Sequence, residues 1–383
     1  CISMITLQII IFPGISNHMT DDDFGNMIFW YTVFNFAASV TGSALSNLRL
    51  RNQGRIYRRS YQFVMMLSLL VTTAGIAVFY LIYTQETEGL LYVMLLVLLM
   101  GTRNYYIVAF RLELKFNKVL LNSILQALGA FIGFYLYLRG CQWHYILLLG
   151  EAFSLVYIFV TTSLWKERLA TEDLSVTIRE YGVFILLTLS SQLILYADRF
   201  ILKFISGNSS LTSYYIATNG TKVLSICVSA SSSVVLSYLS RMNKNGIKGV
   251  KRFLLGVGSA SFIASIFINY LCSEAYVWIL YRNYMDEVQS YIWSISLVSA
   301  VNMLIIMIKP FTIRFVAQKD LMKMEIGCMS IQVLLTILGA AGFGIFGVIL
   351  ARGISFIANA IWIVCLLKKE MGEGSISEYE NHV

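Results

Sequence analysis

The chain has 383 residues, of which 57% are hydrophobic and only 13% are charged, and its formal net charge is +8. Soluble domains carry about 25% charged residues, so this chain could not cover a water-facing surface of its size. The composition excludes an ordinary soluble enzyme, a disordered chain and a disulfide scaffold. Apolar runs of about 20 residues favour an all-α polytopic membrane protein over a β-barrel, whose strands would give short alternating segments.

Twelve apolar segments follow one another along the chain, and we expect each to cross the membrane as a helix. The first is expected to be truncated, because the sequence begins at Cys1, and to end at Pro13-Gly14. The last two are separated only by Gly342-Phe343-Gly344. The predicted spans are 1–16, 26–48, 61–83, 90–110, 119–138, 145–164, 182–204, 213–238, 252–272, 288–309, 325–342 and 344–366.

A polar stretch, WKERLATEDLSVTIREY (165–181), divides these spans into two sets of six. The predicted organisation is an N-terminal lobe at 1–164, a cytoplasmic linker at 165–181, a C-terminal lobe at 182–366 and a cytoplasmic tail at 367–383. A weak internal repeat, in which Gly150 aligns with Gly353, supports a duplication. Two six-helix lobes in the same orientation would surround a central cavity.

The distribution of lysine and arginine predicts the orientation. Of the 29 such residues, 22 lie in alternate loops, such as 49–59 and 241–252, whereas the opposite loops hold only Arg139 and Arg282. The positive-inside rule therefore places both termini in the cytoplasm, as an even number of spans also requires.

Signatures of catalysis are nearly absent. The sequence has no G-x-x-x-x-G-K-[ST] phosphate loop and no H-E-x-x-H or Cys/His metal spacing, so we expect no ATPase, no metal site and no cofactor. No loop between the predicted spans is longer than the 17 residues of 165–181. A membrane polymerase or glycosyltransferase would need a larger outer loop to hold its substrate.

Charged residues inside the spans are the main candidates for a functional site. A charge at the bilayer centre costs on the order of 2.5–3.5 kcal/mol, so each should face a wet cavity, pair with an opposite charge or extend to an interface. Five cations and two acids fall in this class: Arg103, Arg199, Lys203, Lys222, Arg352, Glu151 and Asp198. Arg103, Glu151 and Arg352 are expected to form charge pairs within the membrane.

Lys222 is the strongest candidate for a cavity-facing cation, because it lies about 13 Å along its helix from the outer end. Asn219 precedes it by three residues and shares its face.

Arg199 and Lys203 stack four residues apart, where they repel unless water or an anion lies beside them. Asp198 is about 100° away around the helix and cannot easily neutralise both. Two alternatives stay open. Lys222 pairs with a neighbouring acid, or Arg199, Lys203 and Asp198 form an interfacial charge cluster. A net cationic cavity would take a negatively charged substrate, and lipid-linked phosphates and acidic metabolites both fit.

Three segments resemble the Wzx family of polysaccharide flippases. DDDFGNMIFWYTVFNFAASVTGSALSNLRLR (21–51) is similar to the opening of that family, with an acidic-Phe-Gly turn, an aromatic-rich helix and a basic exit. ADRFILKFISGNSSLTSYYIATNGTKVL (197–224) resembles the start of its second lobe, and FRLELKFNKVLLNSILQALGAFIGFYL (110–136) resembles its fifth-helix region. The similarity rests on pattern rather than on an invariant motif.

The resemblance implies a member of the multidrug/oligosaccharidyl-lipid/polysaccharide exporter superfamily. Such a protein would flip an undecaprenyl-diphosphate-linked oligosaccharide repeat unit (O-antigen or capsule) across the bacterial inner membrane by alternating access, driven by a proton or sodium gradient. Its partners would be the lipid-linked oligosaccharide, membrane lipid, a polysaccharide polymerase and a chain-length regulator, and no nucleic acid.

The resemblance also implies that helices 1, 2, 7 and 8 line a cationic cavity, which assigns Arg199 and Lys222 to the diphosphate. Helix 2 carries no cation here and offers only Tyr31 and Asn35. This departs from a strongly cationic first lobe.

Two other function classes stay open. One is a small-molecule exporter of the related drug-efflux branch or of the major facilitator class. The latter usually carries a G-x-x-x-D-R-x-G-R-type loop after its second helix, where this chain reads RNQGRIYRR (51–59). The other class is an O-antigen polymerase or membrane acyltransferase, which the short outer loops disfavour.

Overall fold

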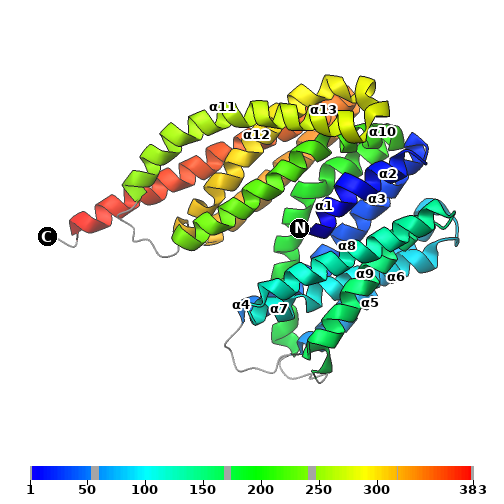
Figure 1. Ribbon diagram of the computed structural model, residues 1–383. Helices are drawn as coiled ribbons and strands as arrows, with labels where there is room; N and C mark the ends of the chain where they lie inside the picture. The colour runs from blue at the N-terminus through cyan, green and yellow to red at the C-terminus, as the bar shows by residue number, and fades with distance from the viewer. Residues whose placement is uncertain (1, 53–59, 168–173, 240–246, 317, 381–383) are drawn as a thin grey trace. The chain divides into compact units, whose positions relative to one another are not determined.

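The computed structural model describes residues 2–52, 60–167, 174–239, 247–316 and 318–380, and these residues form helices and no strand (Figure 1). Eight helical segments among them are long and apolar enough to cross a membrane. The prediction of an all-α polytopic membrane protein is therefore confirmed.

The first half of the chain forms helices that match the first six predicted spans. π-helical turns at Leu7–Ile11 and Ser39–Ser43 join α1 to α2 and α3 to α4. Pro13 does not end the first span as expected. It lies in the first turn of α2, where its missing N–H costs no hydrogen bond. The helices are α1 (Ile2–Thr6), α2 (Phe12–Ser16), α3 (Asp21–Ala38), α4 (Ala44–Arg51), α5 (Tyr61–Thr84), α6 (Leu90–Tyr106), α7 (Val108–Leu112), α8 (Phe116–Leu138) and α9 (His144–Thr161).

The second half forms α10 (Leu174–Leu239), α11 (Ile247–Leu280), α12 (Met285–Phe315) and α13 (Gln318–Glu380). At 1.5 Å per residue, α10 and α13 would each be about 95–100 Å long, three times the thickness of the hydrocarbon core. Each is broken by a glycine whose backbone is not helical, Gly207 (φ 86°, ψ −176°) and Gly344 (φ 57°, ψ −131°). Glycine adopts such angles without steric cost. Each is therefore two helices, and the split predicted at Gly342-Phe343-Gly344 is confirmed.

The helical segments can be compared with the twelve expected spans. The breaks at Gly207 and Gly344 turn the eight candidate spans into ten. Two segments that are shorter or less apolar, Ile2–Ser16 and Asp21–Arg51, stand where the first two spans were expected.

The chain divides into two compact units. Unit 1 comprises residues 1–18 and 29–192, and unit 2 comprises residues 19–28 and 193–383. The division therefore falls inside α10, beyond the stretch 165–181 that was expected to link two lobes.

The described part of that polar stretch packs within unit 1. Glu167 accepts a hydrogen bond from Arg49 at 2.5 Å, and the Tyr181 hydroxyl donates to the carbonyl of Thr41 at 3.1 Å. α10 begins at Leu174, so most of the second half of the stretch is helical. Residues 168–173 lie outside the described residues.

Close packing of α8 on α9 depends on glycine. A Cβ atom at Gly133 would lie 2.5 Å from the Tyr145 carbonyl oxygen, and one at Gly129 would clash with the Leu149 carbonyl. Lipid offers no hydrophobic force between helices, so membrane helices associate through such close contacts between small residues. In unit 2, Gly339 and Gly347 meet in the same way across the break in α13.

The first turns of α3 pack within unit 2. The Asp21 carboxylate accepts a hydrogen bond from Tyr284 at 2.7 Å, and the Asp21 carbonyl accepts one from Thr212 at 2.7 Å. Gly25 approaches the backbone of Asn208 so closely that a side chain would clash. These contacts hold the first turns of the second half of α10, directly after the break at Gly207.

Candidate functional site

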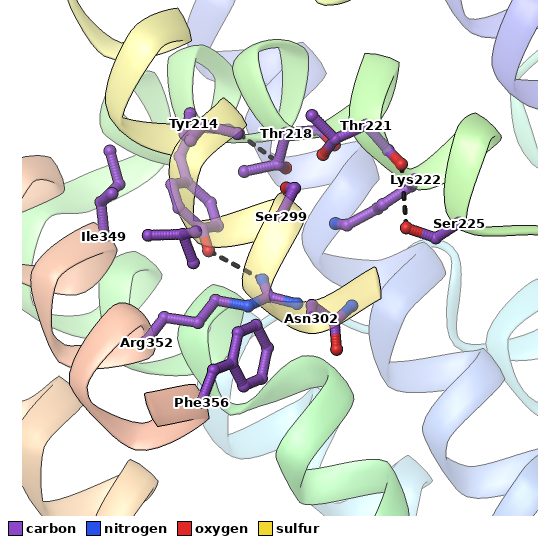
Figure 2. A pocket seen from close by; sticks show the side chains of 12 residues that line it. Tyr214, Thr218, Thr221, Lys222, Ser225, Ser299, Asn302, Ile349, Arg352 and Phe356 are labelled. Atoms are coloured by element: carbon purple, nitrogen blue, oxygen red, sulfur yellow. Dashed lines mark hydrogen bonds between the residues drawn. The ribbon is translucent and has the colours of Figure 1, made fainter. Parts of the chain in front are cut away.

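A cavity of about 30 Å³ lies in unit 2 between the second half of α10, α12 and α13 (Figure 2). A buried water needs about 10–15 Å³ of such space, so the cavity has room for about two waters. Its lining is Tyr214, Thr218, Thr221, Lys222 and Ser225 from α10, Ile295, Val298, Ser299 and Asn302 from α12, and Ile349, Arg352 and Phe356 from α13.

The α10 lining is a polar stripe on an otherwise apolar helix. Thr218, Thr221, Lys222 and Ser225 follow the spacing i, i+3, i+4, i+7, which places them on one face, and Tyr214 extends the stripe by one turn. Most intervening positions are apolar, with Asn219 as a polar exception, so this part of α10 can span lipid and still present a hydrophilic edge.

Lys222 is the unusual member of this stripe. Its side chain is partly exposed as a whole, but its Nζ atom is buried and has no hydrogen-bond partner in the part of the chain that the structure describes. Figure 2 shows the amine directed into the cavity towards α12. Within the described residues it makes no ion pair, so the alternative in which Lys222 is held by a neighbouring acid does not describe its position.

Arg352 approaches the cavity from α13 and is anchored there. Its Nη1 atom lies 2.5 Å from the carboxylate of Asp198 and 3.1 Å from the Tyr214 hydroxyl. The Tyr214 hydroxyl in turn donates to the same carboxylate at 2.5 Å. Asp198 is only 1% exposed, so the carboxylate of this ion pair is buried within unit 2, whereas Arg352 also lines the cavity.

Arg199 and Lys203 were expected at the cavity but are not among the residues that line it. Arg199 is 4% exposed and its guanidinium lies over the rings of Tyr196 and Tyr215, 5.5 and 5.1 Å from their centroids. Lys203 donates to Asn208, one residue beyond the break at Gly207.

Asn219 turns away from Lys222. Its amide donates to the hydroxyl of Tyr276 on α11 at 2.8 Å, and its side chain is completely buried. Residues three apart on a helix differ by about 60° in direction, enough for Asn219 to face α11 while Lys222 faces α12.

The remaining expected residues lie in unit 1. Tyr31 packs its ring edge-on against Phe12, with centroids 5.1 Å apart, and the Asn35 amide donates to the Tyr31 carbonyl at 2.8 Å. Arg103 pairs with Glu151 at 2.5 Å, so two of the three residues expected to form charge pairs meet each other. The third, Arg352, pairs with Asp198 instead.

The charges around the cavity do not cancel. Asp198, Arg199 and Arg352 all interact electrostatically with Lys222. Three basic side chains, Arg199, Lys222 and Arg352, thus lie around one carboxylate in a low-dielectric environment where Coulomb interactions are strong. Within the described residues no group of three or more His, Cys, Asp or Glu side chains could hold a metal ion. The arrangement is suited to an anion.

Several residues that line the cavity were not predicted from the sequence. The stripe from Tyr214 to Ser225 was detectable from its helical spacing, as was the pair Ser299 and Asn302 on α12. Nothing in the sequence brings Arg352 to Asp198, because 154 residues separate them.

Comparison with known proteins gives one structural similarity. A solved structure of "Lipid II flippase MurJ, inward closed conformation" matches with a TM-score of 0.65, covering 90% of this chain and 81% of that one, at 15% sequence identity. No protein-family model and no curated protein matches the chain. At this level of identity the similarity shows that the chain has the fold of a lipid II flippase.

Proposed function

We propose that this protein is a Wzx-type flippase of the multidrug/oligosaccharidyl-lipid/polysaccharide exporter superfamily. It would move undecaprenyl-diphosphate-linked oligosaccharide repeat units of O-antigen or capsule across the bacterial inner membrane by alternating access. The observation that carries the proposal is the buried Lys222 amine, which lacks a hydrogen-bond partner among the described residues and lies beside Arg352 in the fold of a lipid II flippase.

A diphosphate fits this environment in both charge and chemistry. Lys222 offers three N–H donors, and ammonium–phosphate hydrogen bonds are about twice as strong as those between neutral groups. Three basic side chains around one carboxylate suit a dianionic group such as a lipid diphosphate ester. In this structure the cavity has room for only about two waters, so we propose that the substrate enters a wider state of the protein, as alternating access requires.

Further parts of the proposal concern the cellular setting. Both termini would lie in the cytoplasm, and a proton or sodium gradient would drive transport without a cofactor. A polysaccharide polymerase and a chain-length regulator would act on the product. Arg199 would contribute to the attraction of the diphosphate through its charge, without lining the cavity.

The test is surface polysaccharide in the source cell after replacing the cavity cations. Lys222→Ala and Arg199→Ala should abolish surface polysaccharide while the protein reaches the membrane at its usual level. Lys323→Ala is the matched control, since its side chain is 66% exposed and its contact with Asp320 is 4.0 Å long. Wild-type polysaccharide in the Lys222→Ala/Arg199→Ala double variant would overturn the proposal.

The phenotype also separates the other function classes. Loss of a flippase leaves no repeat units at the surface, whereas loss of a polymerase leaves single repeat units there. Changed drug resistance with normal polysaccharide would indicate a small-molecule exporter.

A further inference from the structure

We propose that the cavity of unit 2 recognises a glycosyl phosphate with two chemically different walls. Phosphate oxygens would face α12, and hydroxyl groups of the sugar attached to the phosphate would face α10. This inference rests on the proposed function and specifies which part of the substrate each wall binds.

The α10 wall offers hydrogen-bond acceptors. The hydroxyls of Thr218, Thr221 and Ser225 donate to the α10 carbonyls of Tyr214, Thr218 and Thr221 respectively, each at 2.9 Å. A hydroxyl has one proton and two lone pairs, so a hydroxyl that donates its proton to a backbone carbonyl can only accept a further hydrogen bond. A ligand group that binds these three hydroxyls must therefore donate, whereas the Lys222 amine on the same helix extends towards α12. A sugar hydroxyl does so, whereas a phosphate oxygen would meet lone pairs.

The α12 wall offers donors. Ser299 and Asn302 are three residues apart and share a face, and the structure gives neither side chain a hydrogen bond within the described ranges. Figure 2 shows the Lys222 amine directed towards these two residues. An ammonium, a hydroxyl and an amide together form a donor set for anionic oxygens.

Both walls line the same cavity, so one ligand that enters its wider state would touch both. A group of a few atoms with anionic oxygens at one end and hydroxyls at the other satisfies both walls. A simple anion would use only the donors of the α12 wall, whereas sugar hydroxyls can also donate to the acceptors of the α10 wall. A sugar joined directly to a phosphate carries both kinds of group within that reach.

Two soluble probes distinguish the walls. Methyl phosphate and glucose 1-phosphate carry the same anionic group, but only glucose 1-phosphate carries sugar hydroxyls. Their affinities would be measured by titration calorimetry on the full chain in lipid nanodiscs. The wild-type protein should bind glucose 1-phosphate more tightly. Thr221→Val should weaken glucose 1-phosphate binding about threefold to tenfold, as expected for one lost hydrogen bond, and leave methyl phosphate binding unchanged. Ser299→Ala should weaken both probes by the same factor.

Two variants serve as controls. Thr221→Ser keeps the hydroxyl and should bind glucose 1-phosphate as the wild type does. Thr312→Val removes a threonine on α12 that donates to the Lys309 carbonyl at 2.7 Å but lies outside the cavity, and it should change neither affinity.

The outcomes separate this inference from the proposed function. Equal affinities of the wild type for the two probes, or equal weakening of both by Thr221→Val, would overturn the two-wall inference. The proposed function would survive that result if Lys222→Ala abolished phosphate binding. A wild-type protein that binds neither probe would overturn both.

Discussion

Among the described residues, each unit buries one carboxylate in an ion pair, and the two pairs differ in what surrounds them. In unit 1, Glu151 is 3% exposed and accepts hydrogen bonds from Arg103 at 2.5 Å and from Gln126 at 2.8 Å. Both carboxylate oxygens are engaged and the charges of the ion pair cancel. This network joins α6, α8 and α9, whose packing it supports.

In unit 2, Asp198 is held by Arg352 and Tyr214 in similar geometry. Two more cations, Arg199 and Lys222, lie within electrostatic range. The Lys222 amine is buried and has no hydrogen-bond partner among the described residues. Unit 2 thus has a basic side chain, Lys222, that makes no ion pair among the described residues, whereas the buried pair of unit 1 has one cation and one carboxylate.

The difference separates a structural role from a functional one. A balanced, hydrogen-bonded pair inside a membrane protein meets its own electrostatic needs. An uncompensated cation costs on the order of 2.5–3.5 kcal/mol on insertion scales. In the proposed function this cation serves to bind an anion, and substitutions in each of the two ion pairs test the comparison.

Breaking the unit 1 pair should have the largest effect on stability. Glu151→Leu leaves Arg103 enclosed without its counter-charge and should lower the free energy of unfolding by about 3–5 kcal/mol. The measurement is the apparent melting temperature in detergent, together with the amount of protein in the membrane. The double variant Arg103→Met/Glu151→Leu should recover most of this loss and still export polysaccharide. A stable double variant that fails to export would show that the unit 1 pair also has a role in transport.

Removing the Lys222 amine of unit 2 should stabilise the protein rather than destabilise it. Lys222→Met keeps the volume of the side chain, deletes a buried charge and should raise the free energy of unfolding by up to about 3 kcal/mol while abolishing export. Protein engineering often meets this trade-off between stability and activity at functional sites. The exposed Lys323→Met should change neither property. A lower melting temperature for Lys222→Met would mean that the ammonium stabilises the folded protein.

The helices were predictable because the bilayer fixes the length of apolar segments, whatever the tertiary structure. The break at Gly344 was predictable from a short run of glycines between two such segments. The division inside α10 was not, because Tyr181 and its neighbours combine polar side chains with a packed helical face. Polarity indicated a linker where the structure has the first turns of a helix.

The site was predictable in part. Lys222 stood out because its depth is fixed by counting residues from the helix end. Asn219 was misplaced because its partner, Tyr276, lies on another helix. Asp198 and Arg352 meet only through the tertiary fold, so sequence placed them in separate groups.

Removing the Tyr214 hydroxyl should have a smaller effect on stability, and its effect on phosphate affinity should again distinguish the two units. Tyr214→Phe removes a hydrogen bond to Asp198 and one from Arg352, and should lower the free energy of unfolding by about 1.5–3 kcal/mol. Tyr105→Phe in unit 1 is the matched control, because its buried hydroxyl accepts from Arg49 at 2.8 Å. Both variants should melt earlier, but only Tyr214→Phe should change the affinity for methyl phosphate. Equal phosphate affinity in the two variants would argue that the anchoring of Arg352 does not matter for anion binding.

The smallest effects should come from packing, which the two units share. Gly133→Ala places a Cβ atom 2.5 Å from the Tyr145 carbonyl oxygen, where only the backbone could move, and should cost about 1–3 kcal/mol of stability. Gly75→Ala on α5 meets nothing within 4 Å and should be neutral or gain up to about 1 kcal/mol from helix propensity. Gly347→Ala in unit 2 should lower the melting temperature as Gly133→Ala does, without changing phosphate affinity. If Gly347→Ala changed phosphate affinity, the packing of α13 would belong to the binding site, and the basic side chains around Asp198 would no longer be the only functional difference between the two units.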